Sequence, residues 1–247
     1  MSFLSIILKF SKIFKAKKPP TCSAVIAAAG TSDRCRGEDK LFYFIDGKPV
    51  IAHTIDIFQK CDLINEIIII SQEDKYEEIN KICSQYGFTK VSKIMKGGTT
   101  RQDSVINGVY ATSHTATLIA IHDGARPCIQ MDILKKSIIA ASKYHAAAPV
   151  ISINSTVKNV ENGIIVNTVD RDGLYEIQTP QVFRAEIIKA ALTNAKRKSI
   201  TITDDCMAVE AINVPVHTVE GSHKNIKITN IDDLCIARAF LSNNGDR

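Results

Sequence analysis

The chain alternates between short apolar runs and amphipathic segments, which predicts strands and helices in turn. Apolar runs typical of buried strands occur at residues 23–28, 66–71, 118–122 and 149–153. Between them, segments with apolar residues at helical spacing occur at 50–60, 75–86, 101–111 and 133–144. The run Ile67–Ile70 is apolar at every position, as in strands that are covered on both faces. This order predicts an α/β fold with a doubly wound, mostly parallel Rossmann-like sheet, which binds ligands at the carboxyl ends of its strands.

The pattern changes after residue 153. Two β-rich runs, 155–160 and 163–169, flank Asn162-Gly163, a dipeptide that favours a tight hairpin turn. We expect a β-arm at about residues 154–173 that protrudes from the sheet and joins two subunits. The alternative is an antiparallel ribbon lying on the chain's own sheet. The α/β pattern then returns, with helices expected at 185–196, 204–211 and 231–241 and strands at 216–220 and 225–229.

Capping residues support three of these helices. Thr100 with Asp103, and Asn230 with Asp233, have the spacing at which two side chains bind the free N–H groups of a helix start. Asp204 begins another predicted helix, where the helix dipole favours negative charge.

Composition and charge exclude several classes of protein. With 247 residues, 45% of them hydrophobic, the chain can bury a substantial core. The net charge of +5 equals the five lysines of residues 1–20, which contain no acid, so the remaining body is formally neutral. This argues against a nucleic-acid-binding surface. The seven cysteines are odd in number and form no Cys-x-x-Cys pair, which indicates reduced thiols in the cytoplasm.

Residues 1–20, MSFLSIILKFSKIFKAKKPP, form a basic amphipathic extension ahead of a single domain at 21–247. Their apolar run is too short to span a bilayer, and their charges follow it, unlike those of a secretory signal. We expect the extension to contact the inner, anionic membrane surface weakly. A leader without function is the alternative.

The first strand leads into the loop AAAGTSDRCRGEDK, Ala27–Lys40. Small residues and Gly30 let a ligand approach the backbone, whose free N–H groups bind phosphate. Arg34 and Lys40 add positive charge, so the loop indicates a polyphosphate nucleotide; a tight turn with solvated charges is the alternative. The loop lacks both the Walker A pattern and the three glycines of a dinucleotide fingerprint, which disfavours a nicotinamide oxidoreductase.

Three later stretches are expected at strand ends. GGTTRQDS, residues 97–104, opens a predicted helix, and EGSHKNIKIT, residues 220–229, contains Lys227. IHDGARP, residues 121–127, places Asp123 at the end of a strand, where it can hold Mg²⁺ on a nucleotide phosphate. Arg126 is expected to pair with Asp123 or with the ligand, and His122 to be structural.

Together with VDRDGLYEIQTPQ at 169–181 and ITDD at 202–205, these stretches resemble the 2-C-methyl-D-erythritol 4-phosphate cytidylyltransferase family over about residues 23–241. The resemblance implies a nucleotidyltransferase that joins CTP and 2-C-methyl-D-erythritol 4-phosphate in non-mevalonate isoprenoid synthesis. Its products would be 4-CDP-2-C-methyl-D-erythritol and pyrophosphate. A ribitol-5-phosphate cytidylyltransferase is the nearest alternative, and a non-catalytic nucleotide-binding regulatory module is an alternative of another class.

The resemblance also implies roles for individual residues. Arg34 and Lys40 would stabilise the transition state, and Asp123 would bind Mg²⁺. CTP would be bound by Ala28, Ala29, Gly30, Lys40, Gly98, Ser104 and Asp123. The sugar phosphate would be bound by Arg171, Lys227, Thr156, Thr179 and Arg126. Arg171 is expected to reach the neighbouring subunit of a homodimer.

The sequence departs from the family pattern at a few positions. Ser32 and Cys35 stand where the loop commonly has glycine and methionine, and Gly124 replaces a common alanine. The arm begins with Ser155-Thr156 where Asp-Thr is common, which puts a sugar-contacting carboxylate in doubt.

Overall fold

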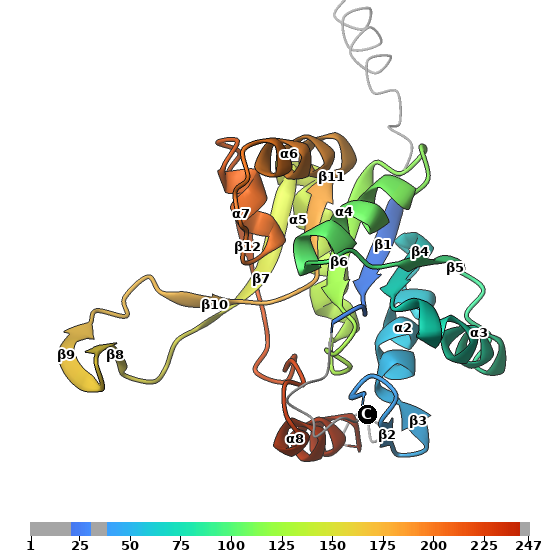
Figure 1. The fold of residues 1–247 in the computed structure, drawn as a ribbon, viewed down its shortest axis with the longest axis horizontal. Coiled ribbons are helices and arrows are strands. Elements are labelled where there is room, and N and C mark those ends of the chain that lie inside the picture. Colours follow the sequence, from blue (N-terminus) through green and yellow to red (C-terminus); the bar gives the residue numbers. More distant parts are fainter. Residues whose placement is uncertain (1–20, 31–38, 243–247) are drawn as a thin grey trace, which may run out of the picture.

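A mixed β-sheet organises the part of the chain that the computed structural model describes, residues 21–30 and 39–242. Within these residues the sheet has eight strands, which neighbour one another in the order β10-β7-β11-β6-β1-β4-β5, with β12 also paired to β7 (Figure 1). Their bounds are β1 Cys22–Ala27, β4 Ile64–Ser71, β5 Val91–Lys96, β6 Leu118–Asp123, β7 Ala146–Ser152, β10 Tyr175–Ile177, β11 Gln181–Arg184 and β12 His217–Glu220. The predicted amphipathic extension and Arg34 lie outside the described residues.

Strand direction places the ends of three central strands at one edge. β1 pairs in parallel with both β4 and β6, so that Ala27 lies beside Ile70 on one side and Asp123 on the other. β5 is parallel to β4, and β12 to β7, whereas β11 is antiparallel to β6 and β7 and β10 to β7. The prediction of a mostly parallel sheet is confirmed, and the loops after β1, β4 and β6 meet at its carboxyl edge.

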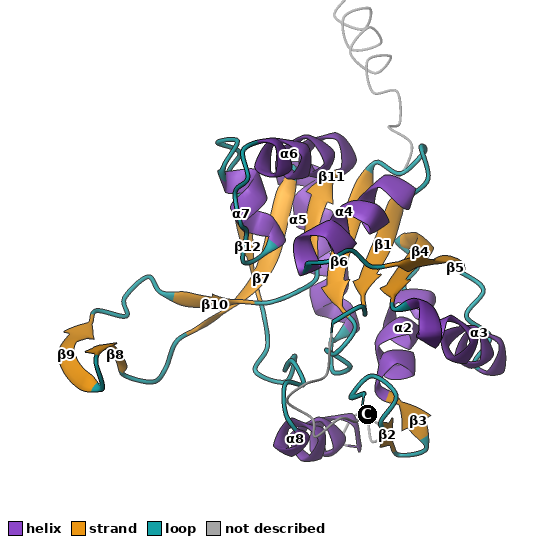
Figure 2. Cartoon of the chain, in the orientation of Figure 1, coloured by secondary structure: helices purple, strands orange, loops and turns teal. Residues whose placement is uncertain are grey.

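Helices cover both faces of this sheet, as Figure 2 shows. One face packs against α2 (Val50–Lys60), α3 (Tyr76–Gln85), α5 (Met131–Tyr144) and α8 (Ile231–Ser242). The other packs against α4 (Arg101–Ala111), α6 (Ala185–Arg197) and α7 (Asp205–Glu210). Within β4, Ile67 and Ile69 enter the first core, while Ile68 and Ile70 enter the second. The continuous apolar run therefore serves two cores, as predicted.

Side-chain caps begin three helices at the predicted residues. At α7, the Asp204 carboxylate accepts a hydrogen bond from the Met207 backbone N–H (3.0 Å). The Thr100 hydroxyl accepts a hydrogen bond from the Asp103 backbone N–H (3.0 Å) at the start of α4. At α8, Asn230 Oδ1 accepts from the Asp233 N–H and Asp233 Oδ2 accepts from the Asn230 N–H, both at 3.0 Å. No helix in the described ranges is both long and apolar enough to cross a membrane.

Some predicted elements differ from the structure. β5, β10 and β11 were not predicted, and β7 begins at Ala146, three residues earlier than expected. The short hairpin of β2 (Phe44–Ile45) and β3 (Lys48–Pro49) precedes α2. The strand expected at 225–229 is absent from the described structure, because side chains occupy the Asn225 carbonyl: Arg126 donates to it at 2.7 Å.

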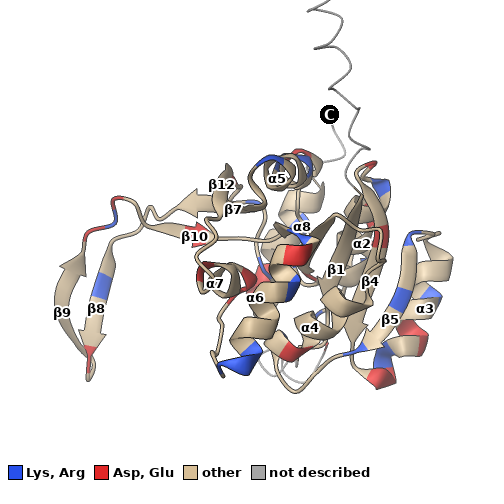
Figure 3. Cartoon of the chain, turned by 90° about the horizontal axis from the view of Figure 1, so that it is seen from above, with Lys and Arg blue, Asp and Glu red and all other residues tan. Residues whose placement is uncertain are grey.

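The arm is a separate two-stranded sheet of β8 (Val157–Glu161) and β9 (Ile164–Val169). It turns at Asn162 and Gly163, whose φ angles of 49° and 80° suit the predicted hairpin turn. Figure 1 shows it protruding from the body, which excludes the alternative of a ribbon lying on its own sheet. Figure 3 shows few charged residues on it, and its exposed side chains include Val160, Ile164, Ile165 and Val166.

Candidate active site

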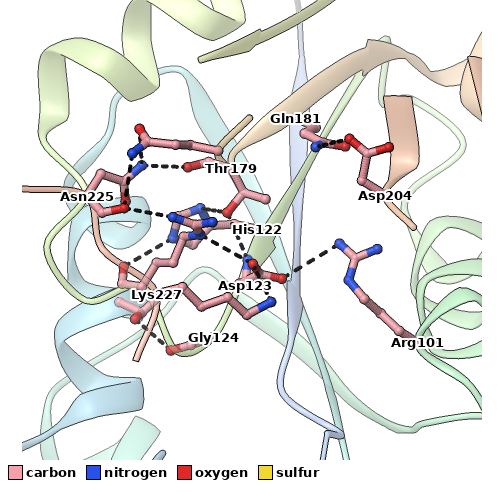
Figure 4. A network of polar contacts seen from close by, with 12 residues as sticks. Arg101, His122, Asp123, Gly124, Thr179, Gln181, Asp204, Asn225 and Lys227 are labelled. Carbon is pink, nitrogen blue, oxygen red and sulfur yellow. Dashed lines mark hydrogen bonds and ion pairs between the residues drawn. The ribbon is translucent and has the colours of Figure 1, made fainter. Parts of the chain in front are cut away.

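Asp123 ends β6 at the carboxyl edge of the sheet, where it is buried among cations of the described chain (Figure 4). Its Oδ2 lies 3.0 Å from Lys227 Nζ and 3.3 Å from Arg126 Nε, and its Oδ1 lies 3.7 Å from Arg101 Nη2. Burial raises the pKa of Asp123, but Lys227, Arg101 and Arg126 outweigh this and hold it well below its usual range. Asp123 is therefore a carboxylate at every physiological pH.

Arg126 and Lys227 reach Asp123 because two loops bind each other. Arg126 is buried, and its Nη1 donates to the Asn225 carbonyl at 2.7 Å. The Ile228 N–H donates to the Ala125 carbonyl at 2.8 Å. These bonds fix the segment around Lys227 beside the loop that follows β6, although this segment is not a strand.

His122 precedes Asp123 in β6 and is buried, and both of its ring nitrogens have hydrogen-bond partners. Its Nε2 lies 3.2 Å from the Arg126 carbonyl, which can only accept, so Nε2 carries the proton. Nδ1 then accepts from the Thr179 hydroxyl at 2.9 Å, and that hydroxyl accepts from the Asp123 backbone N–H at 3.2 Å. Burial lowers the pKa of His122 to about 4. His122 is thus a neutral structural residue, as expected, and Thr179 orients both His122 and Asp123.

Acidification should destabilise the fold, because the buried His122 is neutral. The unfolded chain binds a proton near pH 6.5, whereas folded His122 resists it until about pH 4, so stability falls as the pH falls through this window. The loss in free energy of unfolding should reach about 3 kcal/mol. Urea unfolding at several pH values should give a steeper pH dependence for the wild type than for His122→Gln. Equal slopes would contradict the assignment. His53, whose pKa is also lowered by burial, contributes equally to both proteins.

The nucleotide-binding residues predicted after β1 and before α4 lie against each other. A Cβ on Gly97 would come within 2.4 Å of the Ala29 Cβ and 3.0 Å of Ser104 Oγ. The Gly98 N–H donates to Ser104 Oγ at 3.0 Å. Only a residue without a side chain allows this approach, so Gly97 lets the Ala28–Gly30 turn and the Gly98–Ser104 turn form one surface.

Lys40 lies near the first turn of α8, where its charge acts on Asp233. Leu41 next to it is buried in the core, and its carbonyl accepts from the Ile51 N–H at 2.9 Å, which anchors the end of the loop. Burial raises the pKa of Asp233, but bonds from Thr229 and Asn230 and the charge of Lys40 bring it below its usual value. Asp233 follows Lys227 by six residues, so the segment from Lys227 to Asp233 connects Lys227 with the surroundings of Lys40.

Two predicted residues lie away from Asp123 in this chain. Thr156 precedes β8 and Arg171 follows β9, both exposed at the base of the arm. The Arg171 guanidinium donates to the Asn154 carbonyl. The structure thus gathers Asp123, Arg126, Thr179 and Lys227, and it brings Lys40 near Asp233. Arg171 and Thr156 lie at the base of the β8–β9 arm, which protrudes from the body (Figure 1).

Sequence reasoning gave no role to Arg101 or to its partner Asp205. Arg101 Nη1 and Nη2 lie 3.3 and 2.9 Å from the two oxygens of Asp205, which is fully buried. Burial lowers the pKa of Arg101, but the charges of Asp205 and Asp123 outweigh it and raise this pKa. The available signal was the position of Arg101 at the first residue of α4, where the helix dipole disfavours a cation without an acidic partner.

The donor set around Asp123 suits one kind of metal ion. Among the described residues, no group of three or more His, Cys, Asp or Glu side chains could hold a metal by itself. Asp123 Oδ1 accepts no hydrogen bond from the described residues, since Arg101 stays 3.7 Å away. Mg²⁺ commonly takes one or two protein carboxylates and completes its shell with phosphates and water. A single free carboxylate oxygen near the predicted nucleotide-binding turns fits Mg²⁺.

The chain is similar to proteins of one family. The family model described as IspD, 2-C-methyl-D-erythritol 4-phosphate cytidylyltransferase, matches residues 22–243. A curated protein of that name from Alkaliphilus oremlandii is 40% identical over 222 residues, covering 89% of this chain and 94% of the relative. One from Clostridium acetobutylicum is 41% identical over 227 residues, covering 90% and 97%. The crystal structure of 4-diphosphocytidyl-2C-methyl-D-erythritol synthase from Anaerococcus prevotii matches with a TM-score of 0.80 at 30% identity, covering 91% and 97%.

Proposed function

This chain belongs to the 2-C-methyl-D-erythritol 4-phosphate cytidylyltransferase family and joins CTP to 2-C-methyl-D-erythritol 4-phosphate, and we propose that the residues around Asp123 perform this reaction. The products are 4-CDP-2-C-methyl-D-erythritol and pyrophosphate, in the non-mevalonate route to isoprenoid precursors. One observation supports this assignment of the site: the buried Asp123 carboxylate lies among three cations, Lys227, Arg126 and Arg101. The two turns predicted to bind the nucleotide, Ala28–Gly30 and Gly98–Ser104, belong to the same edge of the sheet.

The reaction needs positioned charge rather than a general base. The attacking group is an oxygen of a phosphate monoester, whose second pKa of about 6 leaves it mostly ionised at neutral pH. It bonds to the α-phosphorus of CTP while the bond to the bridging oxygen of pyrophosphate breaks. Two anions must meet and the leaving group gains charge, so cations stabilise both events. The neutral, fully bonded His122 agrees with a site that requires no base.

The nucleotide side of the site is assigned to the paired turns. Ala28, Ala29 and Gly30 offer backbone N–H groups to the phosphates, and Gly98 with Ser104 lies where the cytidine would bind. Arg34 and Lys40 stabilise the growing charge on the α-phosphorus and the leaving pyrophosphate. Asp123 would hold Mg²⁺, which would neutralise part of the charge of the triphosphate.

The sugar phosphate is assigned to both subunits of a homodimer. Lys227, Arg126 and Thr179 face it from one subunit. Arg171 and Thr156, at the base of the arm, reach it from the other. The arm supports this division because it protrudes from its own body and exposes β-branched side chains with little charge.

The dimer can be tested by making the arm polar. Replacing Ile164 and Val166 of β9, which are 69% and 53% exposed, with serine should convert dimers into monomers. Light scattering after gel filtration would measure the mass. Ile139→Ser is the matched control, since Ile139 is equally exposed (60%) but lies on α5. An arm variant that keeps the wild-type mass would contradict the arm-mediated dimer.

One assay tests the reaction against its alternatives. CTP-dependent pyrophosphate release should be fast with 2-C-methyl-D-erythritol 4-phosphate and slow with ribitol 5-phosphate. The reverse preference would favour the ribitol enzyme, and tight CTP binding without pyrophosphate release would favour a regulatory module.

We propose that residues 1–20 make weak contact with an anionic membrane surface, on the basis of their five lysines and their apolar residues. The full chain should co-sediment with anionic liposomes, and a chain lacking residues 1–20 should not. Equal sedimentation of the two proteins would remove this assignment.

A further inference from the structure

The two oxygens of the Asp123 carboxylate have different surroundings. Oδ2 lies close to Lys227 (3.0 Å) and Arg126 (3.3 Å). Oδ1 faces Arg101 Nη2 at 3.7 Å, which is too long for a hydrogen bond. Among the described residues, Oδ1 is therefore the oxygen that a divalent cation can take, and Arg101 is the group that could compete for it.

Asp205 holds Arg101 at this distance. The guanidinium forms a two-point contact with Asp205, with Nη1 3.3 Å from Oδ1 and Nη2 2.9 Å from Oδ2. The nitrogen that faces Asp123 is thus the one that makes the shorter bond to Asp205 (Figure 4 shows Arg101 beside Asp123). Such bidentate contacts fix both the position and the orientation of an arginine.

Asp205 is itself fixed relative to Asp123. It is fully buried, and its backbone N–H and that of Cys206 both donate to Gln181 Oε1 at 3.0 Å. Gln181 begins β11 and pairs with Ile121 of β6, two residues before Asp123. The two carboxylates are therefore positioned by neighbouring strands, and Arg101 bridges them.

We propose that Asp205 is a positioning residue that holds the Arg101 guanidinium away from Oδ1 of Asp123 and so keeps this oxygen available to the divalent cation. The inference rests on the proposed function, because it takes Asp123 as the ligand of Mg²⁺. Without the charge of Asp205, a shift of about 0.8 Å, from 3.7 to 2.9 Å, would give Arg101 a charge-assisted hydrogen bond to Asp123. That bond would compete with the cation for Oδ1.

Asp205→Asn tests this, because asparagine keeps the shape of the side chain and removes its charge. Mn²⁺ binding to the enzyme–CTP complex, with enzyme in excess and no sugar phosphate present, can be followed by electron paramagnetic resonance. The affinity for Mn²⁺ should fall about 10- to 100-fold, the usual effect of a group that orients a metal ligand. In steady-state assays, high Mg²⁺ should restore kcat, whereas a folding defect would lower kcat at every Mg²⁺ concentration.

Asp204→Asn is the matched control. It removes the same charge one residue away, but Asp204 bonds the Met207 N–H (3.0 Å) and Gln181 Nε2 (2.9 Å), and asparagine is an equally good helix cap. Its Mn²⁺ affinity should change less than about threefold, as for a surface-type charge. Equal losses of Mn²⁺ affinity in the two variants would overturn the inference, since they would show that removing any negative charge near the site weakens cation binding.

A second variant keeps the inference testable if Asp205→Asn does not fold. Arg101→Met removes the competing cation, so Mn²⁺ should bind as tightly as in the wild type or more tightly. A tenfold weaker affinity in Arg101→Met, or an unchanged affinity in folded Asp205→Asn, would overturn the inference. A wild type that releases no pyrophosphate would instead overturn the proposed function, so the two failures are distinguishable.

Discussion

Replacing Asp123 with asparagine is expected to lower kcat by about a thousandfold, equivalent to about 4 kcal/mol of transition-state stabilisation. The substitution removes the carboxylate that would hold Mg²⁺ and leaves Lys227 and Arg126 without the anion that positions them. It should also lower the free energy of unfolding by about 3 kcal/mol, because Arg126 is buried and loses its ionic partner. Steady-state pyrophosphate release and urea unfolding would measure the two effects.

The matched control for this prediction is Asp56→Asn. Asp56 also pairs with two cations, Lys48 at 2.9 Å and Lys60 at 2.8 Å, but it lies on α2 and, among the described residues, pairs with no predicted site residue. Its loss should lower stability modestly and leave kcat within about twofold of the wild type. A folded Asp123→Asn enzyme with near-normal kcat would refute the assignment of Asp123.

Lys40→Ala should lower kcat by about 100- to 1000-fold, since losing one preorganised contact to developing charge raises the barrier by about 3–4 kcal/mol. The fold should persist, because the neighbouring Leu41 anchors this part of the loop in the core. Binding of CTP should weaken much less than kcat, as expected for a contact that strengthens in the transition state. Single-turnover kinetics with saturating CTP would separate binding from chemistry.

Lys81→Ala provides the control for Lys40→Ala. Lys81 is an exposed lysine of α3 and is not one of the predicted site residues. Its removal changes the net charge by the same amount as the removal of Lys40. Its kcat should match that of the wild type. Similar kcat values for the two variants would show that Lys40 acts through overall charge or not at all.

Local sequence patterns were sufficient where an element's own residues determine its structure. The helix limits 50–60 and 101–111 agree with α2 and α4 to the residue, because apolar spacing and the Thr100 cap define them. The carboxyl edge followed from parallel pairing, which brings the ends of β1 and β6 together and places Asp123 beside the turn after Ala27.

Elements that depend on distant partners were not predictable in this way. β11 is four residues long, and it is a strand because β6 and β7 pair with it on both sides. The segment 225–229 alternates like a strand, yet the carbonyl of its first residue, Asn225, accepts hydrogen bonds from the side chains of Arg126 and Gln178, which lie far along the chain. Short segments carry too few residues for periodicity to distinguish these cases.

The candidate site shows the same difference between residues with a local signal and residues that depend on distant partners. The position of Asp123 at the carboxyl end of β6 could be predicted from residue type and from the strand pattern. The pair of Arg101 and Asp205 could not be predicted, because 104 residues separate the two. The helix dipole indicates that Arg101 needs an acidic partner but not which one, and Asp205 has an ordinary explanation at a helix start. Their contact requires the antiparallel β11, whose Gln181 brings the first turn of α7 to the edge.

The protruding β8–β9 hairpin has a consequence for the newly made chain. Ile164, Ile165 and Val166 are consecutive, exposed and β-branched, in a strand with no charged residue. When the free edge of such a strand is not covered, it is a template for amyloid-like association. If the arm pairs in the proposed homodimer, chains synthesised faster than they dimerise should precipitate, and the yield of soluble protein should depend on the rate of expression.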